Sequence, residues 1–179
     1  MICIGLYEWP LNKSAASYKG LYRGNSLIHL PRSRTWEAFF RVAQDGSSAS
    51  YTEENLLLLK KMYTIAKTWY PQTDLLLFSD SAVDLQSVPG AWERIGFDVC
   101  GDSHYYSPIG AGLRDTILSN GAEAASTPDL HLNETGLFAS VEEARIFSLL
   151  CNGLQRSGAN EIESETNWRP WCVWRYAGE

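Results

Sequence analysis

Four consecutive apolar residues, Leu75 to Phe78, constrain the fold of this chain more than any other feature. The run has the length of a strand, and it is unbroken rather than alternating with polar residues. An unbroken apolar run of this length is typical of a strand that is buried on both faces. We therefore expect it to lie inside a sheet.

The segment before this run predicts an amphipathic helix. Its apolar residues recur at helical spacing and are Leu56, Leu59, Met62, Tyr63 and Ala66. The pattern Ser50-x-x-Glu53 predicts a capping box at the start, and the helix should run to about Trp69 and end before Pro71. A helix next to a doubly buried strand indicates a domain that combines helices with a sheet.

The other segments predict shorter elements. We expect strands at 2–7, 26–30, 97–100 and 171–176, and helices at 36–42, 89–94, 113–118 and from 141 to about 152 or 153. Gly96 should end the helix at 89–94 in a C′ position, and Ser140 should cap the last helix, with Glu142 and Glu143 in its first turn. We predict one domain over residues 1–179 with a mixed α/β (α+β) fold. It should have a central mixed sheet of about four to six strands, flanked by helices.

The charge distribution narrows the classes of partner. The chain has a formal net charge of -6, and the sums are +3 over residues 1–50, -3 over 51–100, -5 over 101–150 and -1 over 151–179. Phosphate backbones and anionic membranes repel such a chain, so we expect no nucleic acid or membrane partner. No apolar run approaches the ~20 residues of a membrane span, and the N-terminus lacks the pattern of a signal peptide. We expect a cytoplasmic protein.

Two polar clusters follow predicted strands, where open α/β sheets bind ligands. One is Ser79-Asp80-Ser81, and the other contains Asp102, Ser103 and His104. A small hydrolase or transferase that uses Asp102, Ser103 and His104 is therefore an alternative function, with Asp80 as a further acid. Helix caps and polar turns account for the same residue types, and the chain has no Gly-x-Ser-x-Gly elbow.

The cysteines and histidines do not predict a metal site. The chain has no Cys-x-x-Cys pair and no close histidine pair among Cys3, Cys100, Cys151, Cys172, His29, His104 and His131. The cysteines have apolar neighbours and should behave as small buried hydrophobes. We expect neither a metal nor another cofactor.

The aromatic content allows two interpretations. The chain has seven Trp and nine Tyr, with Trp168, Trp171 and Trp174 close together and Tyr105 next to Tyr106. Tyr and Trp beside polar loops are common anchors of protein interfaces. Large aromatic residues also build cores, which is the alternative for the three Trp residues.

Three segments follow one another along the chain, namely Leu75-Leu-Leu-Phe-Ser-Asp80, Trp92-Glu-Arg-Ile-Gly-Phe-Asp-Val-Cys-Gly-Asp-Ser103 and Leu132-Asn-Glu-Thr-Gly-Leu-Phe-Ala-Ser-Val-Glu-Glu-Ala144. Together they resemble the immunity proteins of bacterial polymorphic toxin and type VI secretion effector systems. The resemblance covers about the second half of the chain. It implies a protein that is not an enzyme and that neutralises a cognate toxin by occluding its active site or another essential surface.

The implied partner is a basic effector, a nuclease with a restriction-endonuclease-like fold. An acidic inhibitor can occupy the basic cleft of such a toxin and gain both steering and specificity. An accessory regulator that blocks another enzyme would use the same binding chemistry. The candidate contact residues are Asp98, Asp102, Ser103, Tyr105, Tyr106, Asp115, Glu134, Glu142 and Glu143.

Overall fold

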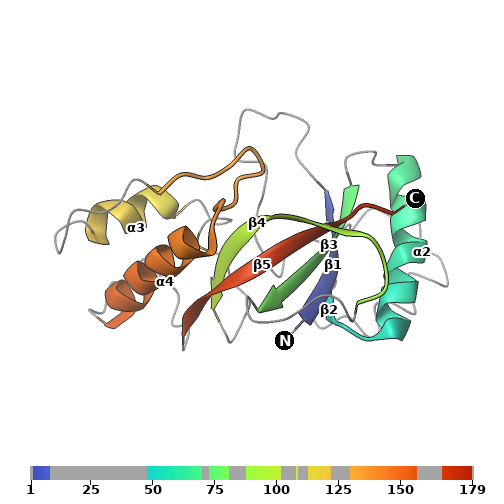
Figure 1. Ribbon diagram of the computed structural model, residues 1–179, viewed down its shortest axis with the longest axis horizontal. Helices are drawn as coiled ribbons and strands as arrows, with labels where there is room; N and C mark the ends of the chain where they lie inside the picture. The colour runs from blue at the N-terminus through green and yellow to red at the C-terminus, as the bar shows by residue number, and fades with distance from the viewer. Residues whose placement is uncertain are drawn as a thin grey trace. The chain divides into compact units, whose positions relative to one another are not determined.

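The computed structural model contains a five-stranded sheet with the strand order β2-β1-β3-β5-β4 (Figure 1). It describes residues 2–8, 48–69, 73–80, 88–101, 108, 113–121, 130–156 and 167–178. The elements are β1 (Ile2–Glu8), β2 (Ser48–Ser50), α2 (Glu53–Trp69), β3 (Thr73–Asp80), β4 (Trp92–Gly101), α3 (Arg114–Gly121), α4 (Val141–Arg156) and β5 (Trp168–Tyr176). The predicted mixed α+β class is confirmed, and five strands lie within the predicted range of about four to six. The expected mixed sheet is wrong for β1, whose pairings with β2 and β3 are both antiparallel.

The chain divides into two compact units. Unit 1 comprises Met1–Ala15, Arg23–Arg94 and Val173–Glu179, and unit 2 comprises Ala16–Tyr22 and Ile95–Cys172. β4 and β5 each contribute residues to both units. The expectation of one domain over residues 1–179 stays a prediction.

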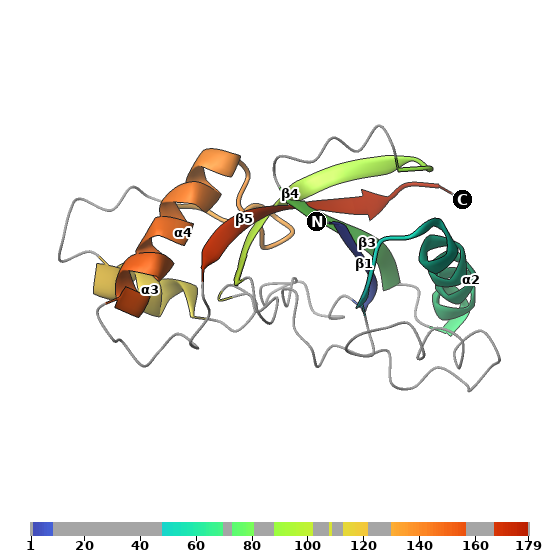
Figure 2. The same ribbon diagram turned by 90° about the horizontal axis from the view of Figure 1, so that it is seen from below.

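Unit 1 is built around β1, β3 and α2. β1 pairs antiparallel with both of its neighbours, so that Cys3 lies opposite Ser50 of β2 and Phe78 of β3. All five residues from Leu75 to Ser79 are buried, which confirms the strand that the apolar run predicted. Figures 1 and 2 show α2 lying beside β1 and β3. Its buried face (Leu56, Leu59, Met62 and Ala66) joins Ile4, Leu6, Leu75, Leu77 and Val88 in one core.

The helix α2 has the predicted bounds but a different cap. The backbone N–H of Asn55 donates to Thr52 Oγ1 at 3.0 Å, so Thr52 caps the helix. Ser50 is the last residue of β2, where it pairs with Cys3. The predicted Ser50-x-x-Glu53 capping box is therefore wrong, because the strand continues to within two residues of Thr52.

The predicted helix at 89–94 is also wrong, because β4 begins at Trp92. Gly96 does not end a helix but lies inside β4 with φ of 152°. A Cβ at this position would lie 2.7 Å from Leu137 Cβ and 3.0 Å from the Phe138 carbonyl oxygen. The positive φ and the close approach both require glycine here. The local residue spacing at 89–94, on which the helix prediction was based, contains no information about either.

Unit 2 contains α3 packed against α4, as both views of the ribbon show (Figures 1 and 2). The predicted N-terminus of α4 is confirmed. Glu143 N–H donates to Ser140 Oγ at 3.2 Å, and Ser140 N–H donates to Glu143 Oε2 at 3.0 Å. Ala144, Phe147 and Cys151 are buried on the predicted apolar stripe.

The C-terminal end of α4 lies beyond the predicted end at 152 or 153. The helix continues to Arg156, with Gly153 inside it. Asn152 Nδ2 donates to the carbonyl oxygens of Ser148 and Trp168, and Trp168 N–H donates to Asn152 Oδ1 at 2.9 Å. The Asn152 side chain therefore joins α4 to the start of β5 and does not end the helix.

Two predicted elements, the strand at 26–30 and the helix at 36–42, lie outside the described residues. The expected helical turns at 113–118 form α3, which begins at Arg114 and extends to Gly121. Within the described part of the chain, no helix is both long enough and apolar enough to cross a membrane.

Candidate partner-binding surface

Apart from Asp98 of β4, the described acidic candidates lie on three segments of unit 2. Asp115 is in the first turn of α3, Glu134 is in the turn that precedes Gly136, and Glu142 and Glu143 are in the first turn of α4. Acidic residues in a first turn also stabilise the helix through its dipole. Their positions therefore have a structural reason as well as a functional one.

Asp115 and Glu142 are the exposed carboxylates on the two helices. The Asp115 side chain is 89 % exposed and accepts a bond from Arg114 Nη1 at 2.7 Å. Glu142 Oε1 lies 3.7 Å from Arg145 Nη1, in an exposed i,i+3 pair. Exposed pairs of this kind contribute little to stability, so both carboxylates can exchange their arginine for a partner's cation.

Glu143 has a structural task. Its Oε2 accepts hydrogen bonds from both the backbone N–H and the hydroxyl of Ser140. The carboxylate holds the N-terminus of its own helix, and binding a partner would have to break this cap. Glu143 is thus a weaker candidate than Glu142.

Asp98 lies inside unit 2 rather than on its surface. Its side chain has 0 % exposure. Its Oδ1 accepts the Val99 N–H at 2.8 Å, and its Oδ2 accepts the Cys100 thiol at 3.5 Å. Burial of the carboxylate speaks against the expectation that Asp98 contacts a partner through the surface.

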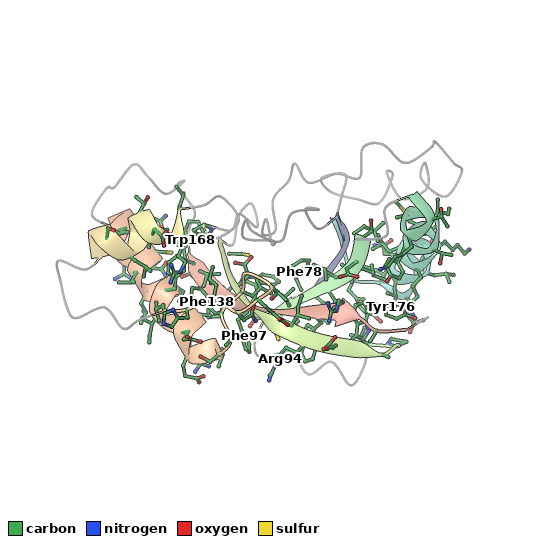
Figure 3. The ribbon with its side chains drawn as sticks, turned by 90° about the horizontal axis from the view of Figure 1, so that it is seen from above. Phe78, Arg94, Phe97, Phe138, Trp168 and Tyr176 are labelled. Carbon is green, nitrogen blue, oxygen red and sulfur yellow. The ribbon has the colours of Figure 1, made fainter. Side chains whose placement is uncertain are left out.

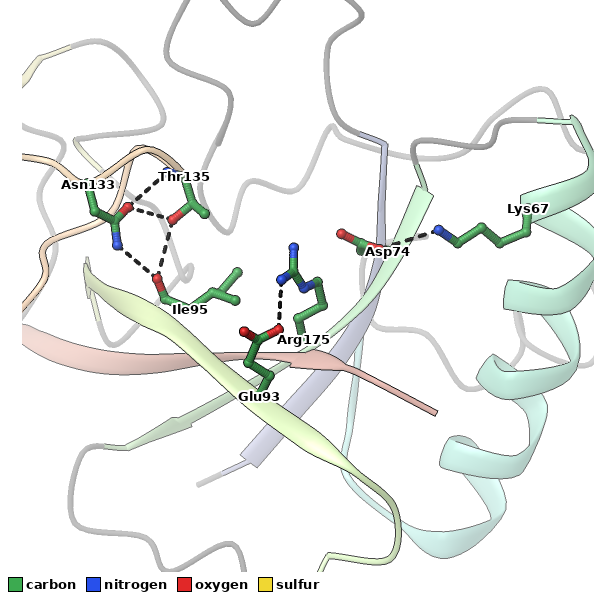
Figure 4. A network of polar contacts seen from close by, with 7 residues as sticks. All are labelled: Lys67, Asp74, Glu93, Ile95, Asn133, Thr135 and Arg175. Carbon is green, nitrogen blue, oxygen red and sulfur yellow. Dashed lines mark hydrogen bonds and ion pairs between the residues drawn. The ribbon is translucent and has the colours of Figure 1, made fainter. Parts of the chain in front are cut away.

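Glu134 lies in a turn whose flanking residues, Asn133 and Thr135, bind the backbone of β4 (Figure 4). Asn133 Nδ2 donates to the Ile95 carbonyl oxygen at 2.9 Å, and Asn133 Oδ1 accepts the N–H groups of Thr135 and Leu137. Backbone bonds in both directions then join Phe138 to Phe97. The turn therefore presents the exposed Glu134 side chain from a rigid base.

The remaining candidates are not placed. Asp102, Ser103, His104, Tyr105 and Tyr106 lie outside the described residues, and with them the three residues of the alternative catalytic site. Asp80 is the last residue of β3. The preceding Ser79 accepts a hydrogen bond from Trp174 Nε1 at 3.1 Å and is buried, so it serves the packing of unit 1.

The aromatic and thiol predictions have mixed outcomes. Trp168 and Trp171 are buried in the core of unit 2, which favours the core interpretation for both. Cys100, Cys151 and Cys172 are buried, as predicted, and form no disulfide among the described residues. Burial raises the pKa of the Cys151 thiol well above its ordinary value, and the negative charge of Asp98 raises it further.

Among the residues that the structure places, no three His, Cys, Asp or Glu side chains form a metal-binding group.

Sequence reasoning missed a cluster of aromatic and basic side chains in unit 1. It consists of Lys60, Tyr63, Trp92 and Tyr176. Trp92 was expected in a helix rather than at the start of β4, so its proximity to Tyr176 could not be foreseen. The alternation of aromatic residues in 171–176 was the available signal, because it places Trp174 and Tyr176 on one face of a strand.

Comparison of the chain with protein-family models, curated proteins and solved structures finds no match.

Proposed function

We propose that this chain is a cytoplasmic immunity protein that binds a basic toxin, with unit 2 as its contact region. In this proposal the toxin is a nuclease, and inhibition results from occlusion of its active site or another essential surface. The protein acts by binding and needs no cofactor. The resemblance of the three sequence segments is the first support for the proposal.

The division of charge between the units carries the proposal. Unit 1 has ten basic and ten acidic residues, whereas unit 2 has five basic and eleven acidic residues. The whole formal charge of -6 therefore belongs to unit 2. A field of one sign on one part of a protein accelerates encounter with an oppositely charged partner.

The exposed carboxylates of unit 2 are the specific contact points in this proposal. Asp115, Glu134 and Glu142 are exposed, and the described pairs of Asp115 and Glu142 are with arginines on their own helices. The basic cleft of a nuclease offers several cations for such carboxylates. Replacing a weak surface pair by an intermolecular one costs little.

The test begins with a tagged pull-down from the native cell and mass spectrometry of the bound proteins. We expect one stoichiometric basic protein, encoded next to this chain, that is toxic when expressed alone and harmless when both are expressed. Coexpression of that protein without a complex, or without protection, would overturn the proposal.

Charge-reversal variants then test the contact region. Glu142→Lys and Asp115→Lys should slow association with the toxin and weaken its dependence on salt. Glu54→Lys, an equivalent change in the first turn of α2 in unit 1, is the matched control and should leave association unchanged. Equal effects of all three variants would assign the result to overall charge rather than to unit 2.

A further inference from the structure

Unit 1 contains a half-buried group of three aromatic rings, contributed by Tyr63 of α2, Trp92 of β4 and Tyr176 of β5. Figure 3 labels Tyr176, which lies beside α2. The Tyr176 ring centroid lies 5.3 Å from that of Trp92 and 6.1 Å from that of Tyr63, and both pairs have an edge geometry. The rings form an apolar floor that remains partly open to solvent.

A lysine to which the described residues offer no anionic partner lies on this floor. Lys60 Nζ is 4.6 Å from the Tyr176 ring centroid. Lys67 is placed similarly over Tyr63, at 5.4 Å, but it also has an ion pair with Asp74 at 3.6 Å. Among the described residues, no carboxylate pairs with Lys60, and the Tyr176 ring is the group that its ammonium contacts.

A second donor, the indole N–H of Trp92, lies beside Lys60. Trp92 Nε1 is buried and has no hydrogen-bond acceptor among the residues that the structure places. A buried donor without an acceptor loses its hydration without compensation. A ligand that supplied an acceptor would restore the lost hydrogen bond.

Gly90 brings the two donors together. It has φ of 129°, and a Cβ at this residue would lie 3.1 Å from Tyr176 Cε2, 3.3 Å from Trp92 Nε1 and 3.4 Å from Lys60 Nζ. The ammonium and the indole N–H therefore both approach the position that a side chain of residue 90 would occupy.

We propose that Lys60 and the indole N–H of Trp92, above the Tyr176 ring, bind a carboxylate from an Asp or Glu side chain of a partner protein. The flexible lysine side chain moves aside to admit the carboxylate, and one oxygen accepts both donors. Bonds to ionised groups are stronger than neutral ones. A site with two donors and aromatic walls in a unit of zero net charge favours a single carboxylate over a phosphate. The site uses residues other than those of the proposed function and does not depend on it.

The test follows the indole N–H signals of the full ¹⁵N-labelled chain by NMR. Trp92→Phe identifies the Trp92 signal among those of the seven Trp residues. Sodium acetate is then added at constant ionic strength against sodium chloride. We expect a saturable shift of the Trp92 signal with acetate only. Lys60→Gln should weaken acetate binding roughly tenfold, as expected for the loss of a charge-assisted hydrogen bond.

Lys61→Gln is the matched control, because Lys61 is the next residue on α2 and is exposed. It should leave acetate binding unchanged. A shift that does not saturate, that chloride reproduces, or that Lys60→Gln leaves intact would overturn the site. Both lysine changes are on the surface of a helix and preserve helix propensity, so the result does not depend on a misfolded variant.

Two further probes test the class of ligand. A blocked tripeptide with a central Glu should bind like acetate, and its Gln analogue should not. Binding of acetate without binding of the Glu peptide would overturn the assignment to a protein side chain. Tighter binding of inorganic phosphate than of acetate would overturn the choice of a carboxylate.

Discussion

Unit 1 and unit 2 use polar side chains in different ways. In the described part of unit 1, the core is formed by one face of α2 on the sheet. Over the whole sequence of unit 1, the charges balance. In unit 2, Asn133, Asn152 and the Ser140–Glu143 pair bind backbone groups and hold loops and helix ends in place. The acidic unit therefore uses part of its polar residues for its own structure. Other carboxylates of this unit, those of Asp115, Glu134 and Glu142, remain exposed.

Core truncation should produce the largest effect and tests whether unit 2 is as well packed as unit 1. Phe147 is fully buried, with its ring centroid 5.2 Å from that of Phe138. We expect Phe147→Ala to lower the free energy of unfolding by about 3–5 kcal/mol, and Leu59→Ala in unit 1 by about 2–5 kcal/mol, as measured by urea denaturation. The control is Leu149→Ala on the same helix as Phe147, because Leu149 is 68 % exposed. A loss below ~1 kcal/mol for Phe147→Ala would contradict a packed core in unit 2.

Substitution of Gly96 should have the next largest effect, because it changes the backbone of β4 in unit 2. Gly96→Ala places a Cβ against Leu137 and Phe138 at a positive φ, and we expect a loss of roughly 2–4 kcal/mol. Gly153→Ala is the control in α4, where a Cβ meets nothing within 4 Å. It should increase the free energy of unfolding by about 0.5–1 kcal/mol, because alanine favours the helix. Two variants of equal stability would show that the close approach at Gly96 is absent.

Removal of the helix caps should have a smaller effect and should distinguish the units. Ser140→Ala removes bonds in both directions at α4 in unit 2, and we expect a loss of about 1–2 kcal/mol. Thr52→Ala removes one bond at α2 in unit 1, and we expect about 1 kcal/mol. Urea denaturation of both variants provides the comparison. A larger loss at Thr52 would mean that the capping box does not strengthen α4.

The smallest effect is expected for the exposed ion pair of unit 1. Arg175 Nη2 lies 2.7 Å from Glu93 Oε2, with side chains 38 % and 56 % exposed (Figure 4). A double-mutant cycle with Arg175→Ala and Glu93→Ala should give a coupling free energy of about 0–1 kcal/mol. The coupling should decrease as salt is added. A coupling above ~2 kcal/mol that salt does not reduce would show that the pair is shielded from solvent.

Elements specified by local patterns could be predicted from the sequence. The apolar spacing of α2, the unbroken run of β3 and the Ser140–Glu143 pair of α4 each depend on residues within one element. Local chemistry was sufficient in these cases, because propensity, periodicity and capping all favour the same structure.

The predictions failed where distant residues decide the structure. Residues 92–94 belong to β4 because the sheet pairs them, although their local spacing also fits a helical turn. Glycine is required at position 96 because Leu137, which lies about forty positions away in the sequence, leaves no room for a Cβ. Pairing with β1 extends β2 to Ser50 and leaves Thr52 as the cap of α2.

The candidate surface shows the same limit. Charge alone could not separate Asp98, which is buried, from Asp115, which is exposed. It could not show that Glu143 binds its own helix while Glu142 faces solvent. Such distinctions depend on which face of an element is covered, and that requires the tertiary fold.

The fixed turn at Asn133 has a consequence for how the protein can be produced. Asn133-Glu134-Thr135 matches the acceptor sequence for N-linked glycans. In the fold, the Asn133 amide nitrogen is bonded to Ile95, and the Thr135 hydroxyl donates to Asn133 Oδ1 at 2.6 Å. A glycan attached in a eukaryotic secretory pathway before folding would occupy this half-buried position and keep the turn from closing on β4. A host that does not glycosylate Asn133 gives the chain that can fold, and an intact mass measurement of the secreted product reveals the difference.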